Sequence, residues 1–147
     1  MKNKIIMKNF LHTTLVTLLI TSAASAQTVY NITADATISG AKIPEQCSNC
    51  VINISKGVTL TINKDVYLKN TVFNGGTILA NQSITFWSDG GFNDTKVIVA
   101  KKAGVTSSGA LSVTNSSFDF TGTSKGTFWA PLTMNNSKMI FEGNSTF

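Results

Sequence analysis

Arginine is absent from the 147-residue sequence, and histidine occurs only once, as His12 near the N-terminus. Acidic side chains are also scarce, with seven Asp and Glu in total. Histidine is the most frequent general acid or base in enzymes, and arginine commonly holds the anionic groups of substrates. A catalytic site within this chain is therefore not expected.

Long hydrophobic runs are absent as well. The longest, residues 10–20, spans about 11 residues, whereas a membrane-spanning helix needs about 20. Three lysines precede this run within the first eight residues, and Ala-Ser-Ala follows it at 24–26. The pattern predicts a secretory signal peptide over 1–26, cleaved near Ala26/Gln27. We therefore expect the mature protein to be secreted or displayed on the outer cell surface.

Positive charge is modest once this leader is set aside. Removal of the three leader lysines lowers the formal net charge from +5 to +2. So small an excess of positive charge does not indicate nucleic-acid binding. The remaining chain is rich in Asn and uses Lys as its only strong base, a composition that we interpret as bacterial.

Cysteine occurs only at Cys47 and Cys50. A zinc site built on this pair needs two more N or S ligands, and one chain with no other Cys and no His beyond the leader cannot supply them. A redox-active pair would be favoured by a helix N-terminus, and residues 44–54 carry no helix signal. In an oxidising compartment an even pair most simply forms a disulfide, so we predict a Cys47–Cys50 bridge.

A short phrase recurs along the second half of the chain. It has the form apolar-x-Asn/Asp-Thr/Ser-x-apolar, and it returns at nearly constant intervals. Repeats with a period in the low twenties are typical of solenoids, propellers and repeat arrays. The four copies are LKNTVFNG from Leu68, FNDTKVIV from Phe92, VTNSSFDF from Val113 and MNNSKMIF from Met134.

The composition between the copies favours strands over helices. Val, Ile, Thr and Phe are frequent, Gly and Asn punctuate them, and apolar residues alternate with a period of two. No convincing helical period is found. We therefore predict an all-β fold, a parallel β-helix solenoid of about 21–24 residues per coil.

We aligned the sequence with itself at the interval that separates Val113 from Met134. Apolar residues then stack on one another at alternate positions, which is the pattern that inward-facing strand residues require. The column Ile98, Asp119 and Ile140 is expected to face outward although two of its members are apolar. The predicted inward columns are Val97/Phe118/Met139, Val99/Phe120/Phe141, Phe92/Val113/Met134 and Leu111/Leu132.

The polar residue of each copy is expected to occupy a turn. Asn and Asp tolerate the left-handed backbone conformation better than most residues. Stacked amides can also hydrogen bond along the solenoid axis. We therefore predict one structural turn ladder formed by Asn70, Asp94, Asn115 and Asn136.

Over about 58–147 the chain resembles the right-handed parallel β-helix proteins of the pectin-lyase-like class, which include secreted bacterial polysaccharide-acting enzymes and adhesins. The resemblance rests on coil length, inward columns and the turn Asn, and includes no enzyme signature. Residues 27–57 are expected to form an irregular N-terminal cap stiffened by the disulfide. Since the last repeat stops within a coil, we expect a C-terminally truncated solenoid, continued by further coils or covered by a partner.

The resemblance implies two kinds of enzyme chemistry. Lyases of this type use a basic residue near calcium-holding carboxylates, and hydrolases use clustered Asp with a nearby His. In the predicted register no two carboxylates form the close pair that glycoside hydrolysis requires. We interpret residues 88–94, SDGGFND, as a turn rather than a cation site, and expect no metal or cofactor.

The tripeptide Thr-Phe-Trp occurs twice, ending at Trp87 and Trp129, two coils apart. Adjacent strand residues point to opposite faces, so one aromatic of each copy faces outward. If the tryptophans do, they lie on one face about 10 Å apart with Ser108 between them. Flat rings at that spacing are suited to stacking on successive sugars of a glycan.

We therefore expect a non-enzymatic, adhesin-like or structural β-helix segment that binds a polysaccharide or cell-surface glycan through Trp87 and Trp129. One alternative is the N-terminal part of a polysaccharide lyase or glycoside hydrolase whose catalytic coils are missing from this chain. A second alternative is an ice-binding protein, which the column Thr85, Thr106 and Thr127 favours.

Overall fold

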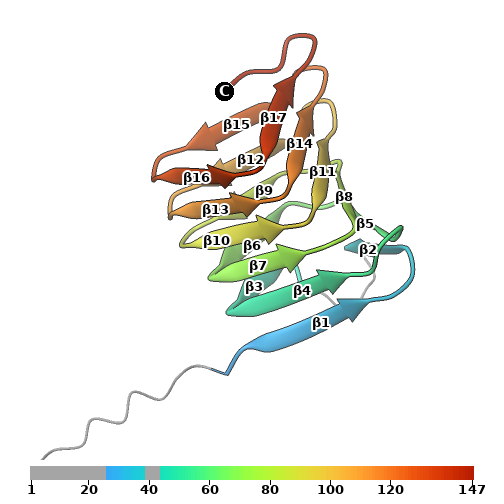
Figure 1. Cartoon of the computed structure of the whole chain (residues 1–147). Helices are drawn as coiled ribbons and strands as arrows, with labels where there is room; N and C mark the ends of the chain where they lie inside the picture. The colour runs from blue at the N-terminus through green and yellow to red at the C-terminus, as the bar shows by residue number, and fades with distance from the viewer. Residues whose placement is uncertain (1–25, 39–43) are drawn as a thin grey trace, which may run out of the picture.

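A computed structural model describes residues 26–38 and 44–147, and within these residues every regular element is a strand. The chain winds through about five turns, here called coils, of a parallel β-solenoid (Figure 1). The predicted all-β solenoid is thus confirmed. Residues 1–25 of the predicted signal peptide lie outside the described part. No helix in the described part is long and apolar enough to cross a membrane.

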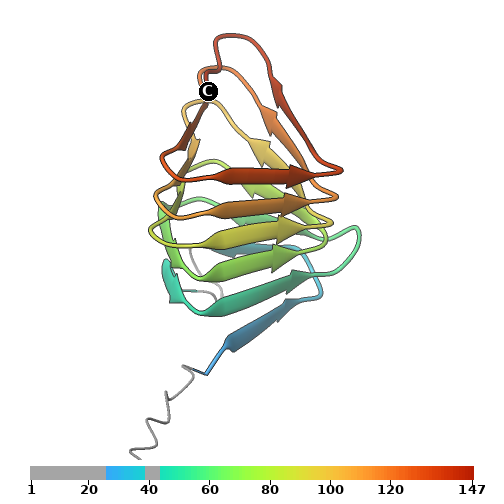
Figure 2. The ribbon, with the colours of Figure 1, turned by 60° about the vertical axis from the view of Figure 1, so that its left-hand side comes forward.

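Successive coils stack their strands into three parallel sheets, and Figure 2 shows one of these sheets face-on as a stack of broad arrows. Sheet A contains β1 (Thr28–Ile32), β4 (Cys50–Ile54), β7 (Thr71–Asn74), β10 (Gly90–Asn93), β13 (Leu111–Thr114) and β16 (Leu132–Asn135). Sheet B contains β2 (Ala36–Ile38), β5 (Thr59–Ile62), β8 (Thr77–Ala80), β11 (Lys96–Val99), β14 (Ser117–Phe120) and β17 (Lys138–Phe141). Sheet C contains β3 (Gln46–Ser48), β6 (Val66–Lys69), β9 (Ile84–Phe86), β12 (Gly104–Ser107) and β15 (Lys125–Phe128).

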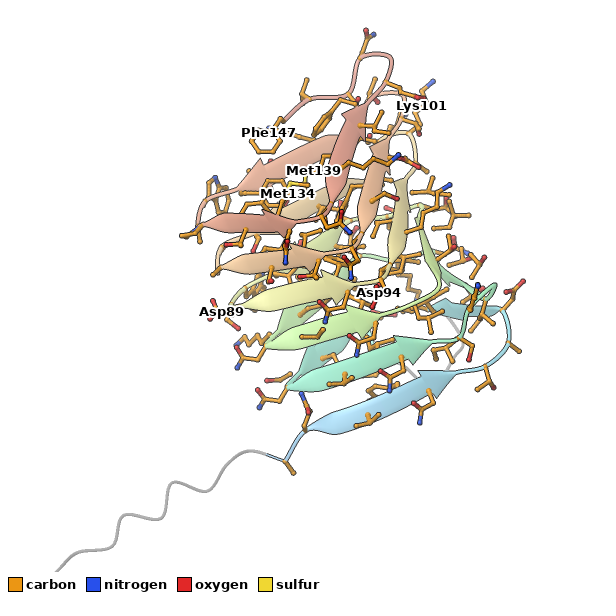
Figure 3. The ribbon with its side chains drawn as sticks, viewed as in Figure 1. Asp89, Asp94, Lys101, Met134, Met139 and Phe147 are labelled. Atoms are coloured by element: carbon orange, nitrogen blue, oxygen red, sulfur yellow. A yellow bond between two sulfur atoms is a disulfide. The ribbon has the colours of Figure 1, made fainter. Side chains whose placement is uncertain are left out.

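The predicted register holds for the last three coils. Strand pairing places Phe118 between Val97 and Met139, and Val113 between Phe92 and Met134. The column of Ile98, Asp119 and Ile140 faces outward, so the alternation is not shifted by one residue. Met134 and Met139 both lie on the last described coil (Figure 3), where no further strand covers them among the described residues.

The interior is a continuous stack of apolar side chains. Phe73 and Phe92 lie parallel at 5.2 Å between ring centroids, and Phe92 meets Phe118 edge-on at 4.9 Å. Each fully buried side chain of this size contributes roughly 1.5–3 kcal/mol through removal of apolar surface from water. One coil cannot bury these rings by itself, so the stacking of neighbouring coils stabilises the fold.

The expectation of an irregular cap over 27–57 is wrong. This segment forms the first coil and, with β4, the start of the second, because β1, β2 and β3 pair in parallel with β4, β5 and β6. Residues 39–43 of it lie outside the described part. The predicted disulfide is confirmed: Cys47 enters the interior from β3, Cys50 from β4, and the bridge closes the sharp corner between them. It therefore fastens a regular corner of the solenoid.

The predicted turn ladder is only partly correct. Asp94, Asn115 and Asn136 follow sheet A strands and have φ of 52°, 49° and 48°. Asn115 Nδ2 donates to Asp94 Oδ1 at 3.2 Å, and Asn136 Nδ2 donates to Asn115 Oδ1 at 2.9 Å. Asn70 is not a member, because it follows β6 of sheet C and its Nδ2 donates to Asn49 Oδ1 at 3.0 Å.

The misassignment has a physical cause. The corner between sheets C and A also requires a left-handed residue, with φ of 55° at Asn49 and 45° at Asn70. Both corners therefore select Asn followed by a small residue, and the same phrase marks two different places. One coil before Asp94 the left-handed position is held by Gly75, with φ of 75°.

A second row of amides was not anticipated. It runs along the outer face of sheet A, where the side chains bond one another at 2.9–3.0 Å from coil to coil. Parallel strands bring identical residues into line about 4.8 Å apart, a distance that one amide bond spans. The row consists of Asn31, Asn53, Asn74 and Asn93.

Candidate functional site

Both Thr-Phe-Trp segments turn the tryptophan outward. In β9 the side chains of Ile84 and Phe86 point into the core, where both are fully buried. The next residue continues the alternation onto the surface, and Trp87 is 55% exposed. Trp129 is 74% exposed at the equivalent position two coils further, while Phe128 is partly buried against the core.

The two tryptophans lie in one column along the solenoid axis. Trp87 N donates to Leu68 O, and Trp129 N donates to Ser107 O, both at 2.9 Å. Ser108 occupies the coil between them, since its N donates to Phe86 O at 2.8 Å. Two coil spacings separate the tryptophan backbones by about 9.6 Å.

Trp87 is held by two neighbours on the preceding coil. The ring of Tyr67 lies 5.4 Å away at an angle of 55°. The Nζ of Lys69 lies 5.5 Å from the Trp87 ring centroid, within the range of a cation–π interaction. These contacts favour the observed orientation of the Trp87 ring.

A hollow of about 310 Å³ opens beside Trp87. Tyr67 and Trp87 form aromatic walls, and Gln46, Ser48 and Lys69 supply polar groups from two successive coils. Directly beside the tryptophan column runs a column of outward hydroxyl residues, Thr85, Thr106 and Thr127. We name the surface formed by Tyr67, Trp87 and Trp129 with their polar neighbours the aromatic face.

Sequence reasoning identified Trp87 and Trp129 but missed Tyr67 and Lys69. The register predicted from the sequence used the repeat interval of the last coils. The coil from β6 to β9 is shorter than that interval, so the prediction placed neither Tyr67 nor Lys69 next to Trp87. In that coil Tyr67 pairs with Thr85. The sequence did contain a signal for this shorter register. Leu68 and Phe86 pair in it, and each is an apolar residue in a run of alternating apolar residues.

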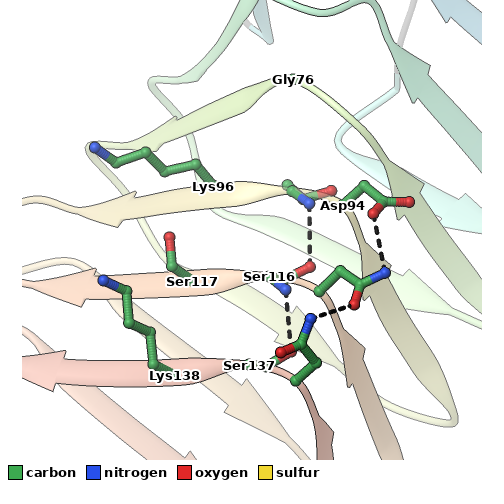
Figure 4. A pocket seen from close by; sticks show the side chains of 10 residues that line it. Gly76, Asp94, Lys96, Ser116, Ser117, Ser137 and Lys138 are labelled. Atoms are coloured by element: carbon green, nitrogen blue, oxygen red, sulfur yellow. Dashed lines mark hydrogen bonds between the residues drawn. The ribbon is translucent and has the colours of Figure 1, made fainter.

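A second hollow, a groove of about 580 Å³, follows the corner between sheets A and B (Figure 4). Lys96, Ser117 and Lys138 lie side by side on successive strands at its margin. Its hydroxyl and amide groups already bond to one another; Ser116 N, for example, donates to Ser137 Oγ at 3.0 Å. Lys96 pairs with Asp119 at 3.6 Å, so the groove offers fewer uncommitted polar groups than the aromatic face.

The carboxylates are dispersed over the described part. Asp89 and Asp94 lie at opposite ends of β10 (Figure 3), about 16 Å apart at the usual rise per residue. The interpretation of residues 88–94 as a simple turn is wrong, because β10 occupies its centre. Within residues 26–38 and 44–147, no three His, Cys, Asp or Glu residues converge as a metal site would require.

Comparison with known proteins gives no relative from which a function could be transferred: no family model matches the chain, and neither does any curated protein or solved structure.

Proposed function

We propose that this chain is a carbohydrate-binding β-solenoid that acts outside the cell, as an adhesin-like or structural module. The observation that carries the proposal is the pair of exposed tryptophans, Trp87 and Trp129, aligned along the axis two coils apart. Exposed aromatic side chains that are grouped on one surface often mark a binding site, whereas single scattered ones do not. Here the two tryptophans are aligned on one surface. The predicted leader supports action outside the cell.

The geometry favours an extended ligand. Rings about 10 Å apart along the axis can contact two separated sugars of one linear chain. The apolar faces of sugar rings stack on the indoles, while Ser108 and the adjacent column of threonines present hydroxyls to the sugar hydroxyl groups. A rigid sheet positions these groups, so little conformational entropy is lost on binding.

The two alternatives lack a supporting arrangement. For a polysaccharide lyase or hydrolase with its catalytic coils outside this chain, the described residues add no support, because Asp89 and Asp94 lie at opposite ends of β10 and do not form the close pair that glycoside hydrolysis requires. An ice-binding surface would need a second matched column of threonines. The column beside Thr85, Thr106 and Thr127 contains the two tryptophans instead.

Titration of the protein with a panel of soluble polysaccharides tests the proposal. At least one should change the tryptophan fluorescence, and calorimetry should give a dissociation constant for it. Trp87→Ala and Trp129→Ala should each weaken binding about fivefold or more, as expected for loss of one ring contact. Thr133→Ala, an exposed change on sheet A, should bind as wild type does. Unaltered affinity in both tryptophan variants would contradict the proposal.

A further inference from the structure

Lys69 differs from the lysines that lie near an acidic group. Two ion pairs join lysine to carboxylate in the described part, Lys64 with Glu45 at 2.8 Å and Lys96 with Asp119 at 3.6 Å. Lys69 takes part in neither; its ammonium lies over the ring of Trp87 instead. The ring orients this ammonium without neutralising its charge, because an aromatic quadrupole carries no net charge.

The hollow beside Trp87 collects further donors around that charge. Gln46, on β3, and Lys69, at the end of β6, line it together with Ser48 and the ring of Tyr67. Gln46 pairs with Tyr67 and Ser48 with Lys69 in the strand register, so the donors sit on two adjacent coils. Amide, hydroxyl and ammonium donors that converge in one recess suit an anionic group with several acceptor oxygens.

We propose that the hollow lined by Gln46, Ser48 and Lys69 binds an anionic substituent, a carboxylate or a sulfate ester, on the glycan whose sugar ring stacks on Trp87. The inference rests on the proposed carbohydrate binding and specifies its ligand class as an acidic polysaccharide. Trp87 provides affinity for the ring, and Lys69 provides selection for the charge. The substituent lies toward the preceding coil, and the rest of the glycan continues toward Trp129.

The spatial order of these groups makes the two roles compatible. Lys69 and Tyr67 approach Trp87 from the preceding coil, whereas Ser108 and Trp129 follow on the next two coils. Trp87 remains 55% exposed, so part of its ring is free of the contacts with Lys69 and Tyr67. A sugar on the exposed part of the ring that borders the hollow brings its charged substituent within reach of the ammonium.

Calorimetry with three derivatives of one glucan oligosaccharide tests the inference: the neutral form, the C6-carboxylated form and the O-sulfated form. The full chain should bind at least one anionic form about tenfold more tightly than the neutral form in dilute buffer. This preference should shrink as salt is raised, because screening weakens the contribution of a partly exposed charge. The carboxylated and sulfated arms show which anion the hollow prefers.

Variants separate this inference from the proposed function. Lys69→Gln should bring the anionic-to-neutral affinity ratio close to one, with a larger loss of affinity for the anionic forms than for the neutral form, and Lys69→Arg should retain the preference. Lys138→Gln, which removes an exposed lysine on sheet B, should leave the ratio as in wild type. Circular dichroism of each variant confirms the fold.

A preference that survives in Lys69→Gln, or equal affinity of wild type for all three derivatives, would overturn the assignment of the hollow. If Trp87→Ala still lowers affinity in that case, carbohydrate binding stands and only the charge selection fails. If neither Trp87→Ala nor Trp129→Ala changes binding of any derivative, the proposed function itself fails.

Discussion

At the scale of single residues, the corners of the solenoid depend on side chains that accept a left-handed backbone. Among the described residues, those other than glycine with positive φ are Asn49, Asn70, Asp94, Lys102, Asn115 and Asn136. All but Lys102 are Asn or Asp, whose short polar side chains bond locally and lower the cost of this conformation. Each Asn or Asp of this set therefore sets the direction of the chain as well as joining a row of amides.

Asn115 allows these two roles to be separated. Asn115→Ala removes the ladder bonds to Asp94 and Asn136 and places a less tolerant residue at φ of 49°. We expect the free energy of unfolding to fall by about 2 kcal/mol in urea denaturation. Asn115→Gly keeps the conformation accessible and should lose roughly half as much.

Asn135→Ala is the matched control, since it changes a nearby exposed Asn within a strand of the same sheet. Its effect should stay within about 0.5 kcal/mol. Equal stability of Asn115→Ala and Asn135→Ala would show that the corner does not depend on a left-handed Asn.

At the scale of elements, the corner between β3 and β4 is fastened covalently. The bridge spans a sequence separation of 3, so the loop-entropy relation gives a stabilisation of about 2 kcal/mol. Cys47→Ala/Cys50→Ala should lower the free energy of unfolding by about that amount. Denaturation of the variant, compared with wild type treated with a reductant, measures the loss.

Both samples should show the same decrease, and the effect should be local. Amide exchange should accelerate in β3 and β4 more than in β13 and β14, which lie three coils beyond β4. Uniform acceleration across all strands would mean that the disulfide stabilises the solenoid as one unit.

How much of the strand register could be predicted from the sequence differs between the late and the early coils. The register of the last three coils was correct because their intervals are constant, as for Val97, Phe118 and Met139. Earlier coils differ because the segments that join the strands vary in length, so β5 pairs with β8, and β8 with β11, at shorter intervals. Asn70 was assigned to the wrong corner because the two corners carry the same Asn-containing phrase and the constant interval no longer distinguishes them in these coils.

The candidate site was predictable to a similar degree. The period of two showed that Phe86 and Trp87 point to opposite faces, but it could not show which residue is buried. That choice depends on the neighbouring coils, where Phe73 and Phe92 enclose Phe86 in the interior. Tyr67 and Lys69 required the register of a shortened coil, which only the structure supplies.

At the scale of the whole molecule, the main contacts between strands connect neighbouring coils. Stability is therefore a sum over interfaces between coils, and a strand paired on both edges opens less readily than a strand paired on one. Strands β7, β8, β10 and β11 have two partners each, whereas β1, β2, β3 and β15, β16, β17 have one among the described residues.

Native-state hydrogen exchange should follow this order. Amides of the central coils should exchange most slowly, and protection should decrease toward both described ends of the solenoid. The pattern is measured by exchange followed with mass spectrometry of peptides from each coil. Identical protection from β1 to β17 would mean that the chain unfolds only as one cooperative unit.

The amide rows also give the molecule an electrical direction. In each row the later coil donates Nδ2 to the Oδ1 of the earlier coil, as from Asn53 to Asn31 and from Asn136 to Asn115. Aligned amide dipoles add, much as peptide dipoles do in a helix. Along the row of Asn31, Asn53, Asn74 and Asn93 the early coils therefore carry the partial positive pole and the late coils the negative pole, so a polymer with its own head and tail experiences two inequivalent orientations along sheet A.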